Sequence, residues 1–391
     1  MRKESAQGKR EFGFFAVAAP GLEQIVADEL GGIGIARREV ATGGVSFGGS
    51  MNQLRLVNLW SRTASRVLVR MDEFHASSFH ELERRAKRVD WKRYAAPGQR
   101  VRFRITCRKS RLYHSDAVAE RLASAVDRQI GGITGASITG PDPEEDHESI
   151  EEEASQLFIV RISEDVCTVS ADSSGELLHR RGYRKALGKA PMRETLAAAM
   201  LYGSEWNSEM PLVDPMCGSG TIAIEAALMS RRVAPGVGRA FAFESWPGHD
   251  EAAWRGTLDR ARDSALTQAL GPILASDRDE GGIGASLANA ERAGVTRDVE
   301  FSVRAISDAP IPGSAGWMVT NPPYGARVGH AGPLKNLYAQ LGKVARVRAQ
   351  GYRVALLSAE RSLEAQLRLN LREVFRTTNG GIPVRLMVGR V

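Results

Sequence analysis

The sequence predicts an α/β protein in which a doubly wound parallel sheet follows a smaller α+β module. Its 391 residues exceed the roughly 250 to 300 residues at which a single core stops growing, so two or three domains are expected. From Met192 onward, helical segments alternate with apolar strand segments, as in a parallel sheet covered on both faces. Several earlier strands alternate apolar and polar residues instead, which is typical of a sheet with one open face.

The beginning of the chain predicts a small α+β unit. Apolar runs and helical spacing indicate a strand at 14–19, a helix at 21–30, a strand at 43–47, and a helix leading into a strand over 54–71.

The next part predicts a second α+β unit. Its elements are a helix at 79–94, a strand with arginines on one face at 101–107, an amphipathic helix at 114–130, and strands at 157–162 and 167–174. The segment at 179–191 is predicted to be a linker to the rest of the chain.

The last part predicts the parallel sheet. Helices are expected at 194–201, 221–229 and 284–294, and strands at 211–216, 273–277, 299–303, 316–321, 352–358, 373–378 and 383–391. The final two strands are close enough in sequence to pair as an antiparallel hairpin.

Composition narrows the class of protein. A hydrophobic fraction of 43% with 25% charged residues is typical of globular proteins, and no window has the roughly 18 apolar residues of a membrane span. The charged opening segment has no apolar stretch behind it, so no secretory signal is expected. Cys107, Cys167 and Cys217 have neither metal-ligand spacing nor an even framework, which favours the cytoplasm and argues against a metal.

Charge favours a polyanionic partner. The formal net charge is +7, yet eight of the acids lie between 141 and 153; without them 53 basic residues face 38 acidic ones, a net of +15. The acidic stretch has no apolar periodicity, so we expect an exposed loop or hairpin tip. Charge alone does not separate nucleic-acid binding from a solvated arginine-rich surface.

The first chemical motif is DPMCGSGT, between an apolar strand and a helix. Ligands of open α/β sheets bind beyond the carboxyl ends of the strands, and Gly218 and Gly220 would let the backbone approach one closely. No lysine follows the glycines, and Asp214 precedes them, which argues against a phosphate loop. A carboxylate there would attract the ammonium and sulfonium groups of S-adenosylmethionine. Cys217 is expected only to pack and to contribute its backbone.

Asp277 ends a second strand of the same predicted sheet. A carboxylate at this position can accept hydrogen bonds from both ribose hydroxyls of a nucleoside. The alternative is a helix N-cap, which has the same residue preference.

The second motif is NPPYG, directly after an apolar strand. Two prolines cannot continue a sheet, so they stiffen this loop. The side-chain oxygen of Asn321 and the carbonyl of Pro322 could accept both N–H bonds of an exocyclic base amine, turning the nitrogen lone pair toward a methyl donor. Tyr324 would stack on a flipped base, and Pro323 would hold the loop. A stiff turn without chemistry is the competing interpretation.

The chain resembles the THUMP-domain guanine-N2 RNA methyltransferases, especially the amino-terminal half of the bacterial members that act on 23S ribosomal RNA. The resemblance covers nearly the whole chain; its blocks are residues 108–122, 178–200, 212–229, 234–236, 246–254, 276–279 and 321–325. It implies a ferredoxin-like domain over 1–72, an RNA-binding THUMP domain over 73–175, and a Rossmann-like seven-stranded methyltransferase domain over 176–391.

The resemblance extends the predicted site. It implies that Thr195 lies near the carboxylate of the cofactor, and its block at 276–279 contains both Asp277 and Arg278. The acid that the family places near the adenine amine corresponds to Ala305 here, with Asp308 three residues later as a possible substitute. The full cofactor set is Thr195, Asp214, Pro215, Met216, Cys217, Gly218, Ser219, Gly220, Thr221, Asp277, Arg278, Asp308 and Asn321.

Two basic segments are candidates for RNA contact. The THUMP-like segment offers Arg108, Lys109, Arg111, Tyr113 and His114, and the linker offers Arg181, Arg184 and Lys185. Basic side chains with interleaved aromatics fit phosphates and bases. The linker residues fit domain docking equally well.

The predicted reaction is direct transfer of a methyl group from S-adenosylmethionine to guanine N2, without a metal and without a strong general base. The substrate expected from the resemblance is 23S ribosomal RNA. Transfer RNA, adenine N6 of a nucleic acid, and a non-catalytic RNA-binding assembly factor are the alternatives.

Overall fold

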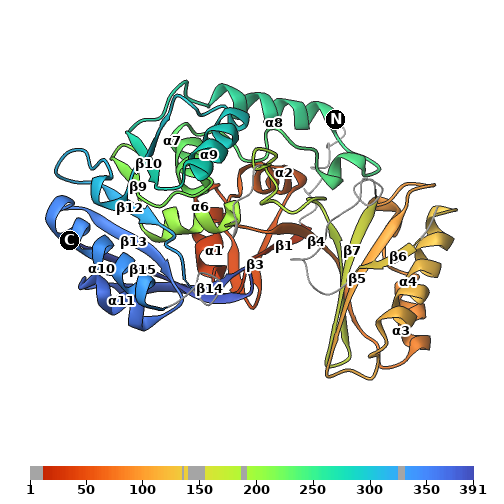
Figure 1. Ribbon diagram of the computed structural model, residues 1–391. Helices are drawn as coiled ribbons and strands as arrows, with labels where there is room; N and C mark the ends of the chain where they lie inside the picture. Colours follow the sequence, from red (N-terminus) through yellow and green to blue (C-terminus); the bar gives the residue numbers. More distant parts are fainter. Residues whose placement is uncertain (1–11, 134–135, 140–154, 186–191, 325–330) are drawn as a thin grey trace.

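The computed structural model describes residues 12–133, 136–139, 155–185, 192–324 and 331–391. The acidic stretch 141–153, the end of the linker and Gly325 lie outside the described residues. Within these described ranges two sheets organise the fold, one of eight strands and one of seven (Figure 1). No helix among the described segments is long and apolar enough to cross a membrane.

The eight-stranded sheet has the order β2-β3-β1-β4-β8-β7-β5-β6. Its strands are β1 (Phe12–Val17), β2 (Arg38–Ala41), β3 (Gly44–Gly49), β4 (Arg66–His75), β5 (Val101–Arg108), β6 (Ala136–Thr139), β7 (Gln156–Ser163) and β8 (Val166–Asp172). The helices that accompany it are α1 (Glu23–Gly32), α2 (Met51–Trp60), α3 (Phe79–Ala86) and α4 (Ser115–Ile130).

The first two predicted units share this sheet. β4 pairs antiparallel with β1 on one side and with β8 on the other. The boundary expected at residue 72 falls inside β4, where the register with β8 shifts between Arg70 and Asp72. The same sheet therefore continues from the ferredoxin-like part into the THUMP part.

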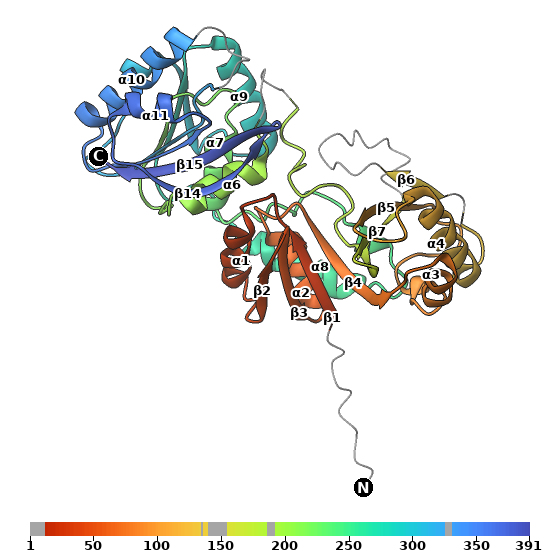
Figure 2. The ribbon, with the colours of Figure 1, turned by 90° about the horizontal axis from the view of Figure 1, so that it is seen from below.

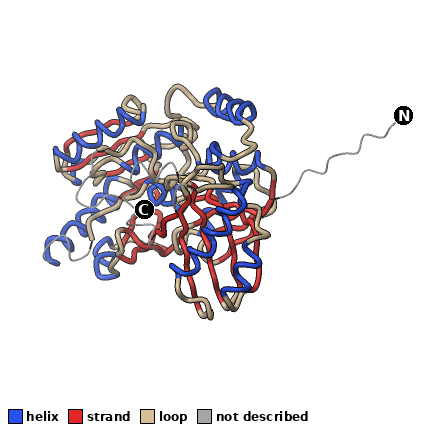
Figure 3. Tube along the Cα trace, turned by 90° about the vertical axis from the view of Figure 1, so that its right-hand side faces the viewer, coloured by secondary structure: helices blue, strands red, loops and turns tan. Residues whose placement is uncertain are grey.

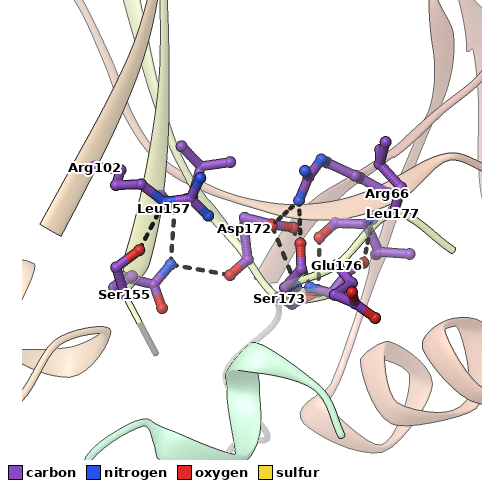
Figure 4. A network of polar contacts seen from close by, with 12 residues as sticks. Arg66, Arg102, Ser155, Leu157, Asp172, Ser173, Glu176 and Leu177 are labelled. Carbon is purple, nitrogen blue, oxygen red and sulfur yellow. Dashed lines mark hydrogen bonds and ion pairs between the residues drawn. The ribbon is translucent and has the colours of Figure 1, made fainter. Parts of the chain in front are cut away.

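A hydrogen-bonded corner closes the end of β8 (Figure 4). The buried guanidinium of Arg66 pairs with the buried carboxylate of Asp172 at 2.5 Å, and Asp172 also accepts the backbone N–H of Ser174 at 3.0 Å. Beside it, Arg102 donates to the Ser155 hydroxyl at 2.6 Å. Burial of an unpaired charge costs several kcal/mol of folding free energy. The ion pair and hydrogen bonds of this corner offset that cost and fix the conformation of the chain after β8.

The seven-stranded sheet has the order β11-β10-β9-β12-β13-β15-β14, which confirms the predicted fold class. Its strands are β9 (Leu212–Asp214), β10 (Ile273–Asp277), β11 (Val299–Val303), β12 (Trp317–Thr320), β13 (Arg353–Ser358), β14 (Arg372–Asn379) and β15 (Ile382–Arg390). β14 and β15 form the expected antiparallel hairpin.

Helices, blue in Figure 3, accompany the strands of this sheet. They are α6 (Glu194–Gly203), α7 (Thr221–Ser230), α9 (Glu280–Ala293), α10 (Ala331–Arg348) and α11 (Arg361–Leu367). Helix α8 (Glu251–Asp263) packs instead on α2, with Trp254 and Ala261 in the hydrophobic cluster of the front sheet. Short 3₁₀ turns are η1 (Trp91–Arg93), η2 (Ala242–Ser245) and η3 (Ile306–Asp308). The strand order reverses between β9 and β12, so a crevice is expected outside their carboxyl ends.

The helix predicted over 79–94 is shorter than expected. It ends at Ala86, and the chain then turns so that Trp91 is fully buried, with its indole N–H donating to the Ala86 carbonyl at 2.8 Å. The Trp91 ring meets Phe158 edge to face at 5.0 Å between centroids. Burial of this large ring outweighs continued helix formation.

The front and rear parts of the chain share hydrophobic clusters, and α8 of the rear part lies beside α2 of the front part (Figure 2). One hydrophobic cluster joins the front sheet to Phe241, Trp246 and Trp254, which follow α7 in the chain. In the other direction, Leu22 of the first unit lies in the core of the seven-stranded sheet. The two parts are therefore docked by interdigitated apolar side chains.

Candidate active site

The glycine loop connects β9 to α7 as predicted. Gly218 and Gly220 both have left-handed backbone angles, with φ of +53° and +79°. Residues other than glycine rarely adopt such angles. A Cβ on Gly220 would lie 3.0 Å from the Ser286 side chain of α9, whereas one on Gly218 would meet nothing within 4 Å. Gly220 thus allows close helix packing, and the space beside the Cα of Gly218 is open.

Asp214 joins the two strands at the crevice. Its Oδ1 accepts hydrogen bonds from the Thr320 hydroxyl of β12 at 2.8 Å and from the backbone N–H of Met216 at 3.3 Å. The side chain is 1% exposed, and burial raises the pKa of its carboxyl group to about 7. A nearby cationic ligand would favour the ionised form.

Asp277 holds the glycine loop from the neighbouring strand. Its Oδ2 accepts the Gly218 backbone N–H at 3.0 Å, and its Oδ1 accepts that of Asp279 at 3.0 Å. The N-cap of α9 is Asp279, whose side chain accepts the Gly281 N–H. The helix-cap alternative for Asp277 is therefore wrong. Its half-buried carboxylate binds the glycine loop instead.

Asn321 follows β12 directly, next to the Thr320 that binds Asp214. Its side-chain oxygen Oδ1 is buried and has no hydrogen-bond partner among the described residues. Buried polar atoms are nearly always paired, so an unpaired acceptor at a ligand crevice needs an explanation. An N–H donor on a bound molecule would satisfy it.

Tyr324 anchors the loop that contains Asn321. Its ring is 8% exposed, and its hydroxyl accepts a hydrogen bond from the Asn379 side chain of β14 at 2.6 Å. The carbonyl of Pro323 accepts from the Tyr338 hydroxyl at 3.4 Å. An open aromatic platform is thus absent at Tyr324 in this structure, and its stacking on a flipped base stays a prediction.

The other predicted cofactor residues differ in exposure. Thr195 is buried in α6, which packs on α7. Arg278 is exposed. Asp308 is exposed at the end of η3, where its carboxylate accepts from the Ser307 hydroxyl at 3.2 Å. Nothing in the structure assigns Asp308 to an adenine amine, so its role stays a prediction.

Glu194 was missed by the sequence reasoning. It is 2% exposed in the first turn of α6, its Oε1 pairs with Arg184 at 3.3 Å, and its buried Oε2 has no described partner. Burial raises its pKa to about 7. An acid inside an otherwise apolar helix is the signal that could have identified it.

Cys217 is 8% exposed and burial raises the pKa of its thiol, so it stays protonated near neutral pH. This agrees with a packing role. Among the described residues, no three His, Cys, Asp or Glu side chains gather as a metal ion would require.

Two of the three linker candidates for RNA contact point inward, which corrects that prediction. The guanidinium of Arg181 pairs with the buried carboxylate of Glu225 on α7 and donates to the Arg62 carbonyl. Arg184 pairs with Glu194. Buried guanidinium groups need such partners. Arg181 therefore joins the first unit to α7, Arg184 is held by α6, and Lys185 alone of the three is exposed.

The THUMP-like candidates form an exposed segment at the end of β5. The side chains of Lys109 and Arg111 are 83% and 78% exposed, and Tyr113 is 69% exposed. The Tyr113 ring lies 4.0 Å from that of His114, between centroids. Arg108 is exposed beside them. The segment is accessible to a polyanion, and its contact with RNA stays a prediction.

A glycine loop, a carboxylate at each of two strand ends, and an unpaired acceptor at the switch point define an S-adenosylmethionine-dependent methyltransferase. Three family descriptions match the chain: an RlmL ferredoxin-like domain at residues 13–68, a THUMP domain at 76–172, and an RMKL-like methyltransferase domain at 181–387. The chain belongs to the RMKL-like methyltransferase family.

The matches to known proteins cover nearly the whole chain. A putative RNA methyltransferase, slr0064 of Synechocystis, is 35% identical over 96% of this chain and 95% of its own length. The ribosomal RNA large subunit methyltransferase K/L of Methylococcus capsulatus is 34% identical over 96% of this chain, which spans 50% of that relative. The crystal structure of SMU.472, a putative methyltransferase complexed with SAH, has 27% identity and a TM-score of 0.85, covering 98% of both chains.

Proposed function

We propose that this protein transfers a methyl group from S-adenosylmethionine to the exocyclic N2 amine of a guanine in RNA, with 23S ribosomal RNA as the substrate. The observation that carries the proposal is the buried, unpaired Oδ1 of Asn321 beside the cofactor crevice. An amine N–H would complete its hydrogen bonding.

The chemistry of a base amine explains why an acceptor is useful here. Its lone pair is delocalised into the ring, so the nitrogen is a weak nucleophile. Acceptance of its N–H bonds by the Asn321 side chain and the Pro322 carbonyl favours a more tetrahedral nitrogen, whose lone pair can point at the methyl donor. S-adenosylmethionine supplies the methyl group on a sulfonium. The protein would act mainly by positioning.

The remaining residues would hold the methyl donor. A cationic ligand would favour the ionised form of Asp214 at the crevice. The open space beside the Cα of Gly218 would let that ligand approach the loop closely. The carboxylate of Asp277 keeps further lone pairs for ribose hydroxyls. Asn321 cannot take a proton, so the proton released by the methylated amine passes to solvent.

RNA as the substrate is supported by the THUMP domain, by the exposed segment from Arg108 to His114, and by the net charge of +7. The named functions of the slr0064 and K/L relatives point the same way. The domain limits 1–72, 73–175 and 176–391 belong to this proposal, as does action in the cytoplasm, where ribosomal RNA is assembled.

Replacement of Asn321 by alanine tests the proposed chemistry. Asn321→Ala should lower the rate of methyl transfer to RNA by about 100-fold or more, while the Kd for S-adenosylmethionine, measured by calorimetry, changes little. The exposed Asn336 of α10 provides the control, and Asn336→Ala should keep full activity. Transfer by Asn321→Ala above a tenth of the wild-type rate would disprove the assigned role.

A further inference from the structure

A cavity of about 500 Å³ lies where three parts of the chain meet, and none of its lining residues belongs to the site described above. Arg55 comes from α2, Lys92 and Arg93 from η1, and His249 from the segment after η2. We propose that this cavity binds a phosphate of the RNA backbone, as a second contact point for the substrate. The proposal depends on RNA being the partner but not on guanine being the target base.

Buried aromatic residues held by hydrogen bonds form the floor of the cavity. Trp246 lines it at 5% exposure, donates its indole N–H to Gln156 at 2.7 Å, and meets Tyr94 edge to face at 4.9 Å between centroids. The backbone N–H of Phe243, also in the floor, donates to Ser173 at 3.2 Å, a residue of the corner in Figure 4. The apolar floor lowers the local dielectric, which strengthens attraction for an anion.

Basic groups dominate the lining. Arg55 is 7% exposed, its Nε is buried without a described partner, and one of its terminal nitrogens donates to the Asp250 carbonyl at 3.3 Å. Lys92 is exposed at the rim, and the guanidinium of Arg93 lies 4.3 Å from the centre of the Phe12 ring, which orients it. Among the described residues that line the cavity, Asp90 is the one acid. A buried arginine donor that lacks an acceptor is the kind of group a phosphate oxygen satisfies.

His249 also lines the cavity. Its Nε2 lies 3.2 Å from the carboxylate of Glu251, which does not line the cavity. The second oxygen of the Glu251 carboxylate pairs with Arg255. The positive charge of Arg255 therefore balances the negative charge of Glu251. The cavity therefore keeps an excess of positive charge from Arg55, Lys92 and Arg93 over Asp90.

The position of the cavity fits an extended ligand better than a small one. Gln156, which holds Trp246, pairs in register with Val101 at the start of β5, whereas the exposed segment of Arg108 to His114 begins at its end. At about 3.3 Å per residue the two ends of this eight-residue strand are about 25 Å apart. An RNA chain can reach both sites, which a free nucleotide cannot.

A charge-reversal pair tests the proposal. Lys92 is exposed and outside the cofactor site, so Lys92→Glu should fold and bind S-adenosylmethionine as the wild type does. The matched control is Lys343→Glu, at an exposed position of α10 with the same change in net charge. Binding of labelled ribosomal RNA is measured by anisotropy across a salt series for the full-length proteins, and binding of AMP and inorganic phosphate by equilibrium dialysis.

We expect Lys92→Glu to weaken RNA binding at least tenfold and to reduce the slope of log Kd against log salt by about one, as for the loss of one phosphate contact. Lys343→Glu should change affinity less than twofold. Equal effects of the two variants, or no RNA binding by the wild type, would overturn the proposal. So would AMP or phosphate binding that Lys92→Glu abolishes without changing RNA affinity. A selective Lys92 effect without guanine methylation would leave the cavity assignment standing and reject the proposed function.

Discussion

Asp214 shows how one residue both orders the fold and prepares the site. Its buried carboxylate connects β9 to β12 through Thr320, and the burial that raises its pKa to about 7 makes it responsive to a cation. The sequence predicted an acid that attracts a positive group. It did not predict that one oxygen would already be used within the protein, because the strand that pairs across the crevice lies about a hundred residues later in the chain.

The raised pKa of Asp214 predicts that the free energy of unfolding depends on pH. A carboxyl group whose pKa is higher in the folded state than in the unfolded state, near 3.8, destabilises the protein progressively as pH rises between those values. Asp214→Asn removes this destabilisation. The unfolding free energy of the variant relative to the wild type, measured by urea denaturation without cofactor, should therefore rise between pH 5 and pH 8 by on the order of 2 to 3 kcal/mol. An unchanged difference across this range would argue against a raised pKa at Asp214.

Glu225 predicts a second effect at the residue scale. This fully buried carboxylate on α7 pairs with Arg181 and accepts the Tyr183 hydroxyl at 2.8 Å. Glu225→Gln would leave a buried guanidinium without its counter-charge and should lower the unfolding free energy by about 3 kcal/mol. In the control, Asp259→Asn removes a pair with Arg262 in which both side chains are 57% exposed, and should cost at most about 0.5 kcal/mol. Equal costs would show that the buried pair does not secure the linker.

At the scale of elements, local pattern predicted most of the secondary structure. Apolar periodicity was sufficient for α4, for α7, and for the hairpin of β14 and β15. It failed after α3, where burial of Trp91 replaces the last helical turns. It also could not show that β4 pairs with both β1 and β8, because strand pairing over a hundred residues depends on tertiary contacts rather than local propensity.

A close approach between elements far apart in the chain gives a test at this scale. Gly21 has φ of +83°, and a Cβ there would lie 1.7 Å from the backbone oxygen of Arg376 in β14. Gly21→Ala should therefore force the first unit away from the hairpin and lower the unfolding free energy by more than 2 kcal/mol, from backbone strain and the clash together.

The control for this variant is Gly34, where φ is +97° but a Cβ would meet nothing within 4 Å. Gly34→Ala carries backbone strain alone and should cost about 1 kcal/mol. Denaturation curves in urea compare the two proteins. If Gly21→Ala costs no more than Gly34→Ala, the first unit does not contact β14 as the structure has it.

At the scale of the whole molecule, the sequence indicated separable parts, whereas the structure joins them. A cut near residue 175 would expose Phe241 and Trp254, which complete the hydrophobic cluster of the front sheet. Sequence reasoning predicted both motifs of the site and their common sheet edge, since strand ends and glycine turns are local features. It could not predict that Arg181 and Arg184 face inward, because a basic residue has the same sequence signal at an RNA surface and at a buried ion pair.

The most direct measurement is methyl transfer from labelled S-adenosylmethionine to unmodified ribosomal and transfer RNA in parallel, followed by mass spectrometry of the nucleosides. The proposed function predicts N2-methylguanosine in the large-subunit ribosomal RNA, formed by the wild type and lost with Asn321→Ala. Label found only in transfer RNA, or recovered as N6-methyladenosine, would contradict the assigned substrate or base. Cofactor binding with no methylated product would contradict the catalytic role itself.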